Sequence, residues 1–298
     1  MSAFSACRIC PKNCGVHREI GETGFCHTGA NLTVARAALH HWEEPCISGS
    51  RGSGTVFFAG CNLGCVFCQN TKISRGGAGK EITADRLYEI FFELERKGAH
   101  NITLVTPSHF LPTILPVIRR AKESGISIPF VLNCGGYESV DSLKALEGLI
   151  DIYLPDFKYI SPKLAGKYSH APNYAEVAKA ALREMVRQQP SCCFSKDGLL
   201  TRGVIVRHLL LPGQIKDAKA VLSYLFTTYG NQIFISIMNQ FTPTKTLENY
   251  PEINRKVTKR EYETLIDYAL SLGIEHAFIQ EGETAQESFI PDFTNQGV

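Results

Sequence analysis

Short apolar runs alternate with amphipathic stretches along most of the chain after residue 54. Runs rich in β-branched and aromatic residues predict strands, at residues 55–60, 102–106, 129–133, 150–154, 203–211, 233–238 and 277–280. Stretches with apolar residues at helical spacing predict helices, at residues 83–97, 111–124, 139–149, 174–189, 216–229 and a last segment that starts after Thr258. We expect a long loop from residue 154 to 173 and a turn at residues 196–198.

Helix ends and faces support this pattern. Thr83 and Ser139 stand where a residue that caps a helix is expected, and Thr258 and Glu261 have the spacing of a capping box. The apolar face of the first helix comprises Leu87, Ile90, Phe91 and Leu94. The apolar face of the last helix is expected to comprise Tyr262, Leu265, Ile266, Ala269 and Leu270.

The alternation of strands and helices, repeated six or more times, predicts an α/β fold with a parallel sheet and helices outside it. Closed or partly closed, such a sheet is a (β/α) barrel of the TIM type, here a partial barrel of about six units. Catalytic groups in such barrels lie at the carboxyl ends of the strands. Residues 51–298 are assigned to this barrel domain.

Residues 1–50 have little periodicity and carry four closely spaced cysteines, Cys7, Cys10, Cys14 and Cys26. A segment with so few apolar residues needs a staple to fold. We therefore expect a small metal-binding N-terminal module. The four thiols suit either a tetrahedral zinc site or a second iron–sulfur cluster, and spacing does not separate the two. Unligated thiols are the remaining alternative.

Composition narrows the class of protein. The chain has 298 residues, 44% hydrophobic and 20% charged, which is ordinary for a globular protein. No apolar run reaches the length of a membrane span, and a net charge of +2 argues against a nucleic-acid partner. The cysteine count of 11 is odd, and seven lie in two tight clusters. This pattern indicates metal binding in a cytoplasmic protein.

The second cluster follows the first predicted strand directly, with Cys61, Cys65 and Cys68 in C-x3-C-x2-C spacing. Three thiolates on one short loop can bind three irons of a [4Fe–4S] cubane and leave the fourth iron open. A zinc site would need a fourth ligand nearby, and the next histidine downstream is His100. Buried core cysteines are the other alternative.

This loop, with Phe67 before its last cysteine, resembles the radical S-adenosylmethionine (SAM) superfamily. The resemblance is greatest to the pyruvate formate-lyase activating enzyme group, in its PflX-like branch. The segments that carry it are EEPCISG (43–49), GSGTVFFAGCNLGCVFCQN (52–70), NITLVTPSHF (101–110), IYLPDFKY (152–159), VRHLLLPG (206–213) and IMNQFTP (237–243).

The resemblance implies that Cys61, Cys65 and Cys68 are the catalytic residues that bind a [4Fe–4S] cluster, with SAM on its open iron. One electron, supplied by a flavodoxin- or ferredoxin-type donor, cleaves SAM to methionine and a 5′-deoxyadenosyl radical that abstracts hydrogen from the substrate. The activase group implies a protein or peptide substrate, such as a glycyl-radical enzyme. Two alternatives stay open: a small-metabolite substrate, and a non-enzymatic electron carrier or zinc-bound interaction protein.

The same resemblance indicates which residues bind SAM. Many members carry Gly-Gly-Glu after the second barrel strand; this chain departs from that pattern and offers Thr106 and Ser108 instead. Other strand ends carry further candidates, and the full set is Phe67, Thr106, Ser108, Asn133, Cys134, Asp156, Lys158, Arg207 and Gln240. Because neighbouring strand residues face opposite ways, only one of Arg207 and His208 can point into the barrel, and the resemblance favours Arg207.

Overall fold

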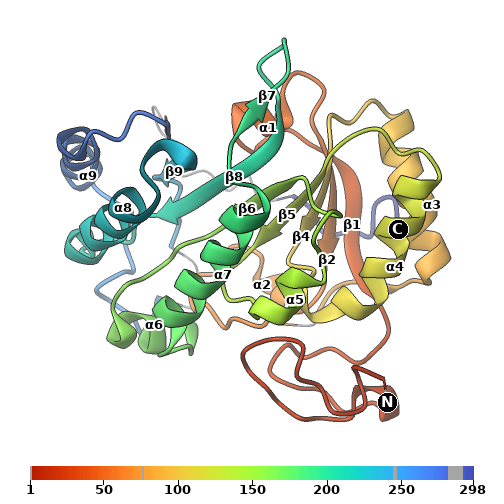
Figure 1. The fold of residues 1–298 in the computed structure, drawn as a ribbon. Helices are drawn as coiled ribbons and strands as arrows, with labels where there is room; N and C mark the ends of the chain where they lie inside the picture. Colours follow the sequence, from red (N-terminus) through yellow and green to blue (C-terminus); the bar gives the residue numbers. More distant parts are fainter. Residues whose placement is uncertain (1, 76, 244–246, 281–290) are drawn as a thin grey trace.

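The computed structural model describes residues 2–75, 77–243, 247–280 and 291–298. Within these residues, seven strands run parallel to their neighbours in one curved sheet (Figure 1). They are β2 (Ser53–Phe58), β4 (Ile102–Val105), β5 (Phe130–Cys134), β6 (Ile152–Pro155), β8 (Leu200–Leu209), β9 (Phe234–Met238) and β10 (Ala277–Ile279). This arrangement confirms the predicted α/β class with a partial barrel.

Three further strands extend the sheet. β1 (Thr33–His40) pairs antiparallel with β2, and β3 (Lys80–Glu81) pairs antiparallel with β1. β7 (Cys193–Phe194) pairs antiparallel with the start of β8, around the turn expected at residues 196–198. The sheet order is therefore β10-β9-β8-β6-β5-β4-β2-β1-β3.

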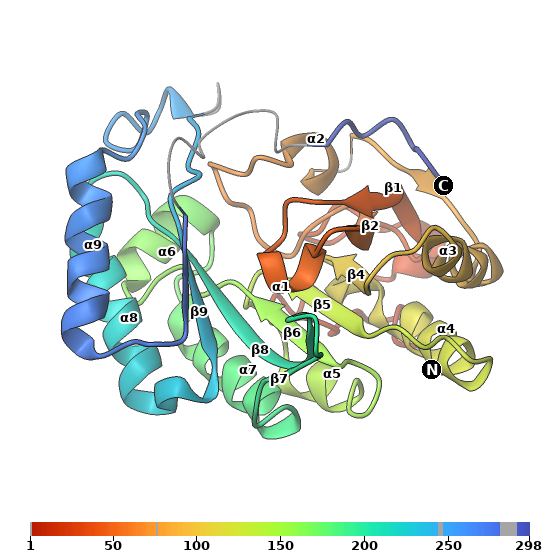
Figure 2. The ribbon, with the colours of Figure 1, turned by 90° about the horizontal axis from the view of Figure 1, so that it is seen from above.

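Helices cover the outer, convex side of the sheet (Figure 2). The longer ones are α3 (Ala84–Arg96), α4 (Leu111–Glu123), α7 (Tyr174–Gln188), α8 (Ile215–Tyr229) and α9 (Lys259–Leu272). Shorter ones are α1 (Pro45–Ser48), α2 (Thr71–Ser74), α5 (Val140–Lys144) and α6 (Pro162–Ser169), with 3₁₀ turns η1 (Arg18–Ile20), η2 (Ser108–Phe110) and η3 (Gly230–Gln232).

The central strands are buried on both faces. Every residue of β2, β4 and β6 is buried, because helices pack on one face and the barrel interior fills the other. This burial explains why these strands appear in the sequence as continuous apolar runs. The predicted caps are also present: Thr83 accepts a hydrogen bond from the Arg86 amide, and Thr258 and Glu261 form a full capping box.

Three local predictions are wrong. The loop expected from residue 154 to 173 contains α6, which Ser161 caps. The helix expected to reach residue 149 ends at Lys144, and the chain continues in turns up to a left-handed Gly148. Leu270, placed on the buried face of α9, is 63% exposed, because that face is only wide enough for Tyr262, Leu265 and Ala269.

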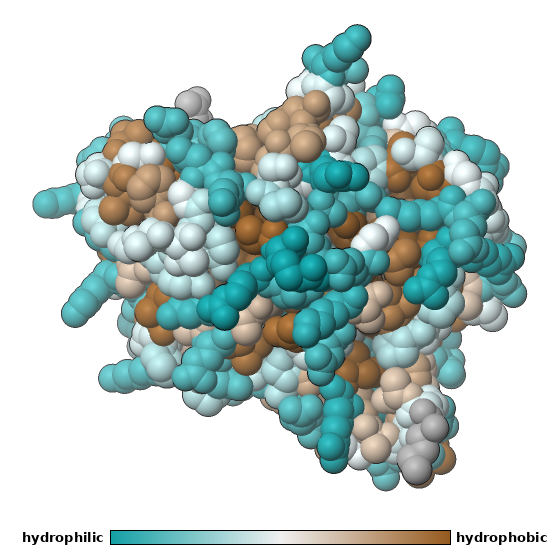
Figure 3. Space-filling view, viewed as in Figure 1, coloured by the Kyte–Doolittle hydropathy of each residue, from teal (hydrophilic) through white to brown (hydrophobic). Residues whose placement is uncertain are grey.

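The N-terminal 50 residues divide differently from the expectation. Residues 33–40, placed in the metal module, form strand β1 of the main sheet. Residues 2–32, called the cysteine segment below, contain only the short turn η1 among regular elements. In Figure 3 the cysteine segment forms a lobe that protrudes below the helices, with polar and apolar side chains mixed on its surface.

Candidate active site

The carboxyl ends of six neighbouring parallel strands surround one cavity of about 510 Å³. Each strand from β2 to β9 in the sheet contributes at least one polar or sulfur-bearing side chain from its end or the loop after it. In sheet order these are Cys61, Thr106, Asn133, Asp156, Arg207 and Gln240. The cavity therefore lies at the edge of the sheet where a (β/α) barrel places its chemistry.

The cluster loop, residues 61–68, begins directly after β2. Gly60 has a φ of +82°, a left-handed conformation that turns the chain away from the strand. Cys61, Cys65 and Cys68 all line the cavity. The Leu63 amide donates to the Cys61 sulfur at 3.3 Å, and the Cys65 sulfur lies 3.0 Å from the Ser169 hydroxyl.

This donor set fits a [4Fe–4S] cluster. Three soft thiolates from one loop face the same space, and the cavity beyond them leaves room for a ligand on a fourth iron. The loop is also tightly enclosed, because a Cβ on Gly64 would lie 2.1 Å from the Arg75 guanidinium and 2.9 Å from the His170 ring. A side chain at this position would displace the Arg75 guanidinium and press on the His170 ring.

A lysine–aspartate pair stands at the end of β6. Lys158 Nζ lies 2.5 Å from Asp156 Oδ2, and both residues line the cavity. Burial alone would lower the pKa of Lys158, but the Asp156 carboxylate and the Cys65 thiol raise it above its usual range. The ammonium group is therefore a fixed positive charge beside the cluster loop.

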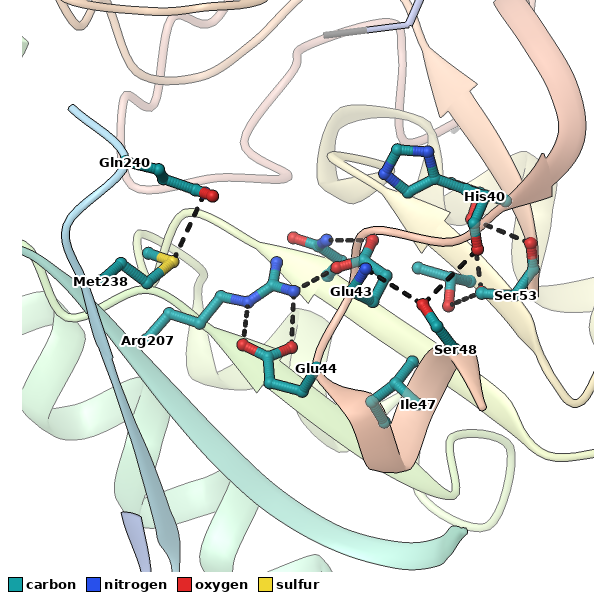
Figure 4. A network of polar contacts seen from close by, with 12 residues as sticks. His40, Glu43, Glu44, Ile47, Ser48, Ser53, Arg207, Met238 and Gln240 are labelled. Atoms are coloured by element: carbon teal, nitrogen blue, oxygen red, sulfur yellow. Dashed lines mark hydrogen bonds and ion pairs between the residues drawn. The ribbon is translucent and has the colours of Figure 1, made fainter. Parts of the chain in front are cut away.

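Arg207 forms a second charged group in the cavity wall (Figure 4). Its guanidinium donates to Glu44 at 2.8 and 2.6 Å and to Glu43, so one cation lies between two carboxylates. Asn133 Nδ2 also donates to Glu43, at 3.3 Å. Burial would raise the pKa of Glu44, but Arg207 holds it below its usual value. His208 points away from the cavity and bonds the Phe157 carbonyl.

From the sequence, Glu43 and Glu44 suit the substrate side of the barrel and an exposed linker equally well. They lie between β1 and α1, more than 160 residues before Arg207. The sequence offers only two adjacent acids before Pro45, a pattern equally typical of an exposed linker. The two glutamates can be assigned to the site only when β1 is recognised as part of the sheet, because the residues that follow β1 then lie at the strand ends.

The residues after β4 divide between cavity and core. Thr106, with a φ of +55°, lines the cavity. Ser108, expected beside it, is buried in η2 and donates to Glu138 at 2.9 Å, so the structure does not bring it to the cavity. The left-handed turn at Thr106 rotates the following residues away from the strand ends. Cys134 lines the cavity but is almost fully buried against Glu138.

Phe67 and Gln240 close the opposite side of the cavity. The Phe67 ring packs against Phe241 with centroids 6.0 Å apart. Gln240 accepts a side-chain hydrogen bond from Gln280 at 3.1 Å, and its carbonyl accepts one from Gln69, just after the cluster loop. The structure thus brings eight of the nine predicted SAM-contact residues to one cavity, all but Ser108.

The four cysteines of the N-terminal segment lie outside this cavity. All four are free thiols: Cys7 and Cys26 are buried, Cys10 is half-buried and Cys14 is exposed. In the described part of the chain, no three His, Cys, Asp or Glu side chains converge closely enough to hold one metal ion.

The family model described as the Radical SAM superfamily matches residues 55–214, which is more than half of the chain. The chain belongs to the radical SAM superfamily. Membership implies SAM-dependent radical chemistry with a [4Fe–4S] cluster. Across the described residues, the structure has no helix long and apolar enough to span a bilayer.

A curated relative is the uncharacterized protein MJ0674 of Methanocaldococcus jannaschii, 28% identical over 274 residues, which are 89% of this chain and 75% of the relative. Among solved structures, Streptococcus suis SuiB bound to S-adenosylmethionine has a TM-score of 0.52 at 12% identity, over 75% of this chain and 49% of SuiB. SuiB bound to its precursor peptide SuiA has a TM-score of 0.50 at 10% identity, over 75% of this chain and 47% of SuiB.

The FeFe-hydrogenase maturase HydG from Carboxydothermus hydrogenoformans has a TM-score of 0.51 at 13% identity, over 80% of this chain and 55% of HydG. The chain spans about half the length of these solved proteins. At such identities the likeness concerns the fold alone, and it agrees with the partial barrel.

Proposed function

We propose that Cys61, Cys65 and Cys68 bind the [4Fe–4S] cluster of this radical SAM protein, and that SAM occupies the cavity beside them. The observation that carries the proposal is the placement of three thiols from one loop at the carboxyl end of the first parallel strand, facing that cavity. When bound, cluster and SAM together supply a 5′-deoxyadenosyl radical and methionine from one electron.

The cavity wall has the groups that SAM requires. Lys158 offers a fixed ammonium for the SAM carboxylate, and Asp156 keeps that ammonium in place. Thr106, Asn133 and Gln240 offer hydroxyl and amide groups for the adenosine and amino portions. Phe67 and Cys134 present apolar surface, which helps to exclude water.

We further propose that the substrate is a protein or a peptide, as in the pyruvate formate-lyase activating enzyme group, with a glycyl-radical enzyme as one such substrate. A cavity of about 510 Å³ is ordinary for one small ligand, so a substrate that joins SAM has to approach at the mouth. Trp42, 58% exposed, lines that mouth. SuiB, with the same fold, was solved with its precursor peptide.

The proposal includes a flavodoxin- or ferredoxin-type electron donor and a metal in the N-terminal cysteine segment, as zinc or as a second iron–sulfur cluster. It also places the enzyme in the cytoplasm. The support for that place is the cysteine pattern, in which seven of the eleven cysteines lie in two tight clusters that suit metals better than disulfides.

The decisive experiment is SAM cleavage by the anaerobically reconstituted protein with dithionite as reductant. We expect 5′-deoxyadenosine from the unaltered protein and none from Cys61→Ala. Cys193→Ala is the matched control, because Cys193 is an exposed cysteine on β7. Equal 5′-deoxyadenosine from the Cys61→Ala and unaltered proteins would contradict the proposal. Deuterium transfer from labelled peptides or metabolites into 5′-deoxyadenosine then distinguishes the substrate classes.

A further inference from the structure

Backbone turns fold the four cysteines of the N-terminal segment toward one another. The Asn13 amide bonds the Cys10 carbonyl, and the Gly15 amide bonds the Cys7 carbonyl, so Cys7, Cys10 and Cys14 lie on one tight loop. The Phe25 amide donates to the Cys14 sulfur at 3.4 Å, which brings the neighbouring Cys26 to the same loop.

The sulfurs of this segment have donors of the kind that metal-bound thiolates use. Besides the Phe25 amide on Cys14, the Arg18 guanidinium points at the Cys7 sulfur at 3.9 Å. The Thr28 hydroxyl lies 3.2 Å from the Cys26 sulfur. Donors aimed at sulfur stabilise the thiolate form and adjust the reduction potential of an iron–sulfur cluster. Two of the four sulfurs thus have an N–H donor, and a third has a hydroxyl neighbour.

The position of the segment favours a redox-active group over zinc. Zinc has no redox chemistry and would act here as a structural staple. An iron–sulfur cluster can take up and release one electron, and the segment lies against the loop to which we assign the catalytic cluster.

The cysteine segment touches the cluster loop directly. A Cβ on Gly60, the residue before Cys61, would lie 2.6 Å from the Cys26 carbonyl and 2.4 Å from the Thr28 methyl group. A Cβ on Gly64, inside the cluster loop, would lie 3.1 Å from the Phe25 ring. Glycine at both positions allows Cys26 and its neighbours to pack against the loop without any intervening side chain.

Lys12 lies between the two groups of cysteines. Its ammonium stands 3.9 Å above the Phe25 ring and donates to the His170 carbonyl at 2.6 Å. Phe25 and His170 are also the residues that pack against Gly64 of the cluster loop. One positive charge therefore lies beside both the cysteine segment and the cluster loop, where it offsets the negative charge that a reduced cluster carries.

From these contacts we propose that Cys7, Cys10, Cys14 and Cys26 bind a second [4Fe–4S] cluster that passes electrons to the cluster at Cys61, Cys65 and Cys68. The electron transfer to the cluster at Cys61, Cys65 and Cys68 rests on the proposed function, whereas the binding of the second cluster does not. Four thiolates fill all four irons, so this cluster binds no SAM and acts only as a carrier. One electron from a flavodoxin- or ferredoxin-type donor reduces it from the 2+ to the 1+ state, and passing that electron on returns it to 2+.

Metal content tests the site independently of activity. After anaerobic reconstitution we expect about eight irons per chain and no zinc, and about four irons after Cys61, Cys65 and Cys68 are all changed to alanine. That triple variant should keep a dithionite-reduced EPR signal that does not respond to SAM. Cys10→Ala with Cys14→Ala should keep about four irons and a signal that does respond. Stoichiometric zinc, or an iron-free triple variant that is folded by circular dichroism, would overturn the site.

A comparison of reductants tests the relay. For each protein, SAM cleavage with reduced flavodoxin or ferredoxin is divided by SAM cleavage with dithionite, a small reductant that can reach either cluster. We expect this ratio to fall by about an order of magnitude in the Cys10→Ala, Cys14→Ala protein and to stay constant in Cys193→Ala. An unchanged ratio in the first variant would overturn the relay. Loss of dithionite-driven cleavage in the unaltered protein would instead contradict the proposed function.

Discussion

At the scale of single residues, the cavity wall combines buried charges that depend on one another. Arg207 is the clearest case, because its guanidinium is the shared partner of Glu43 and Glu44. Removing one partner from a buried ionic group costs more than the pair contributes, since the charges left behind lose both water and counter-charge. The stability of this wall therefore depends on a cation that the sequence presents as an ordinary strand residue.

We predict that Arg207→Met lowers the free energy of unfolding by about 3–5 kcal/mol, measured by urea denaturation under anaerobic conditions. Arg202→Met is the matched control, because Arg202 is an exposed residue of the same strand. Its replacement should change stability by less than about 0.5 kcal/mol. Similar losses in the two variants would contradict the assigned role of the buried ion pair.

Glu138 is a buried acid whose protonation depends on folding. Burial raises its pKa from 4.5 to about 7, against the hydrogen bonds from Ser108 and Cys134. A raised carboxyl pKa means that the folded state favours the protonated form. The stabilisation that protonated Glu138 gives to the folded state is complete below the unfolded pKa near 4.5, and it is lost as pH rises through about 7.

We predict that the stability of the unaltered protein relative to Glu138→Gln falls by about 3 kcal/mol as pH rises from about 4.5 to about 8. Burial lowers the pKa values of His109 and His208 to about 4, so these two residues make the protein more stable as pH rises. Their effect is the same in both proteins and cancels when the stability of one is subtracted from that of the other. Urea denaturation across this range provides the measurement. Glu123→Gln, at an exposed site in α4, should show no such trend.

At the scale of elements, helix α9 starts with a complete capping box. The Thr258 hydroxyl accepts from the Glu261 amide, and the Glu261 carboxylate accepts from the Thr258 amide at 2.8 Å. We predict that Thr258→Ala lowers the free energy of unfolding by about 1 kcal/mol. Thr228→Ala, in the exposed last turn of α8, should be neutral or slightly stabilising, because alanine favours helix interiors. An equal loss in both variants would exclude capping as the cause.

Elements with local signals could be predicted, whereas elements that depend on tertiary contacts could not. The caps at Thr83 and Thr258 involve residues three positions apart, so spacing alone locates them. Strand β1 offers no alternation, because Val34, Ala35, Ala37 and Ala38 are buried on both faces. It becomes a strand through its pairing with β2. Leu270 similarly shows that the width of a buried helix face depends on what packs against it.

At the scale of the whole molecule, the sheet explains how much of the site could be predicted. A parallel sheet brings the carboxyl ends of its strands to one edge, so residues such as Asn133 and Asp156 could be expected to meet. The approach of Glu43 to Arg207 could not, because it depends on the path between two elements that join the sheet at different places. The contact between Cys26 and Gly60 is of the same long-range kind.

That long-range contact depends on Arg18, which is 1% exposed. Its guanidinium donates to the His109 carbonyl of the barrel at 2.6 Å and, within the cysteine segment, to the Gly29 carbonyl at 2.6 Å. It also packs over the rings of Phe4 and Phe110. One side chain thus holds the segment to the barrel, and removing it leaves a buried carbonyl without a partner, at a cost of about 1–3 kcal/mol.

We predict that Arg18→Met accelerates amide hydrogen exchange throughout residues 2–32 by about tenfold or more, because each 1.4 kcal/mol of opening free energy changes exchange by about that factor. Strands β4 to β6 should keep their protection, since their hydrogen bonds lie within the sheet. Arg8→Met, at an exposed site in the same segment, is the control and should leave exchange unchanged. Faster exchange in the strands as well would mean that Arg18 supports the whole fold and not only the attachment of the cysteine segment.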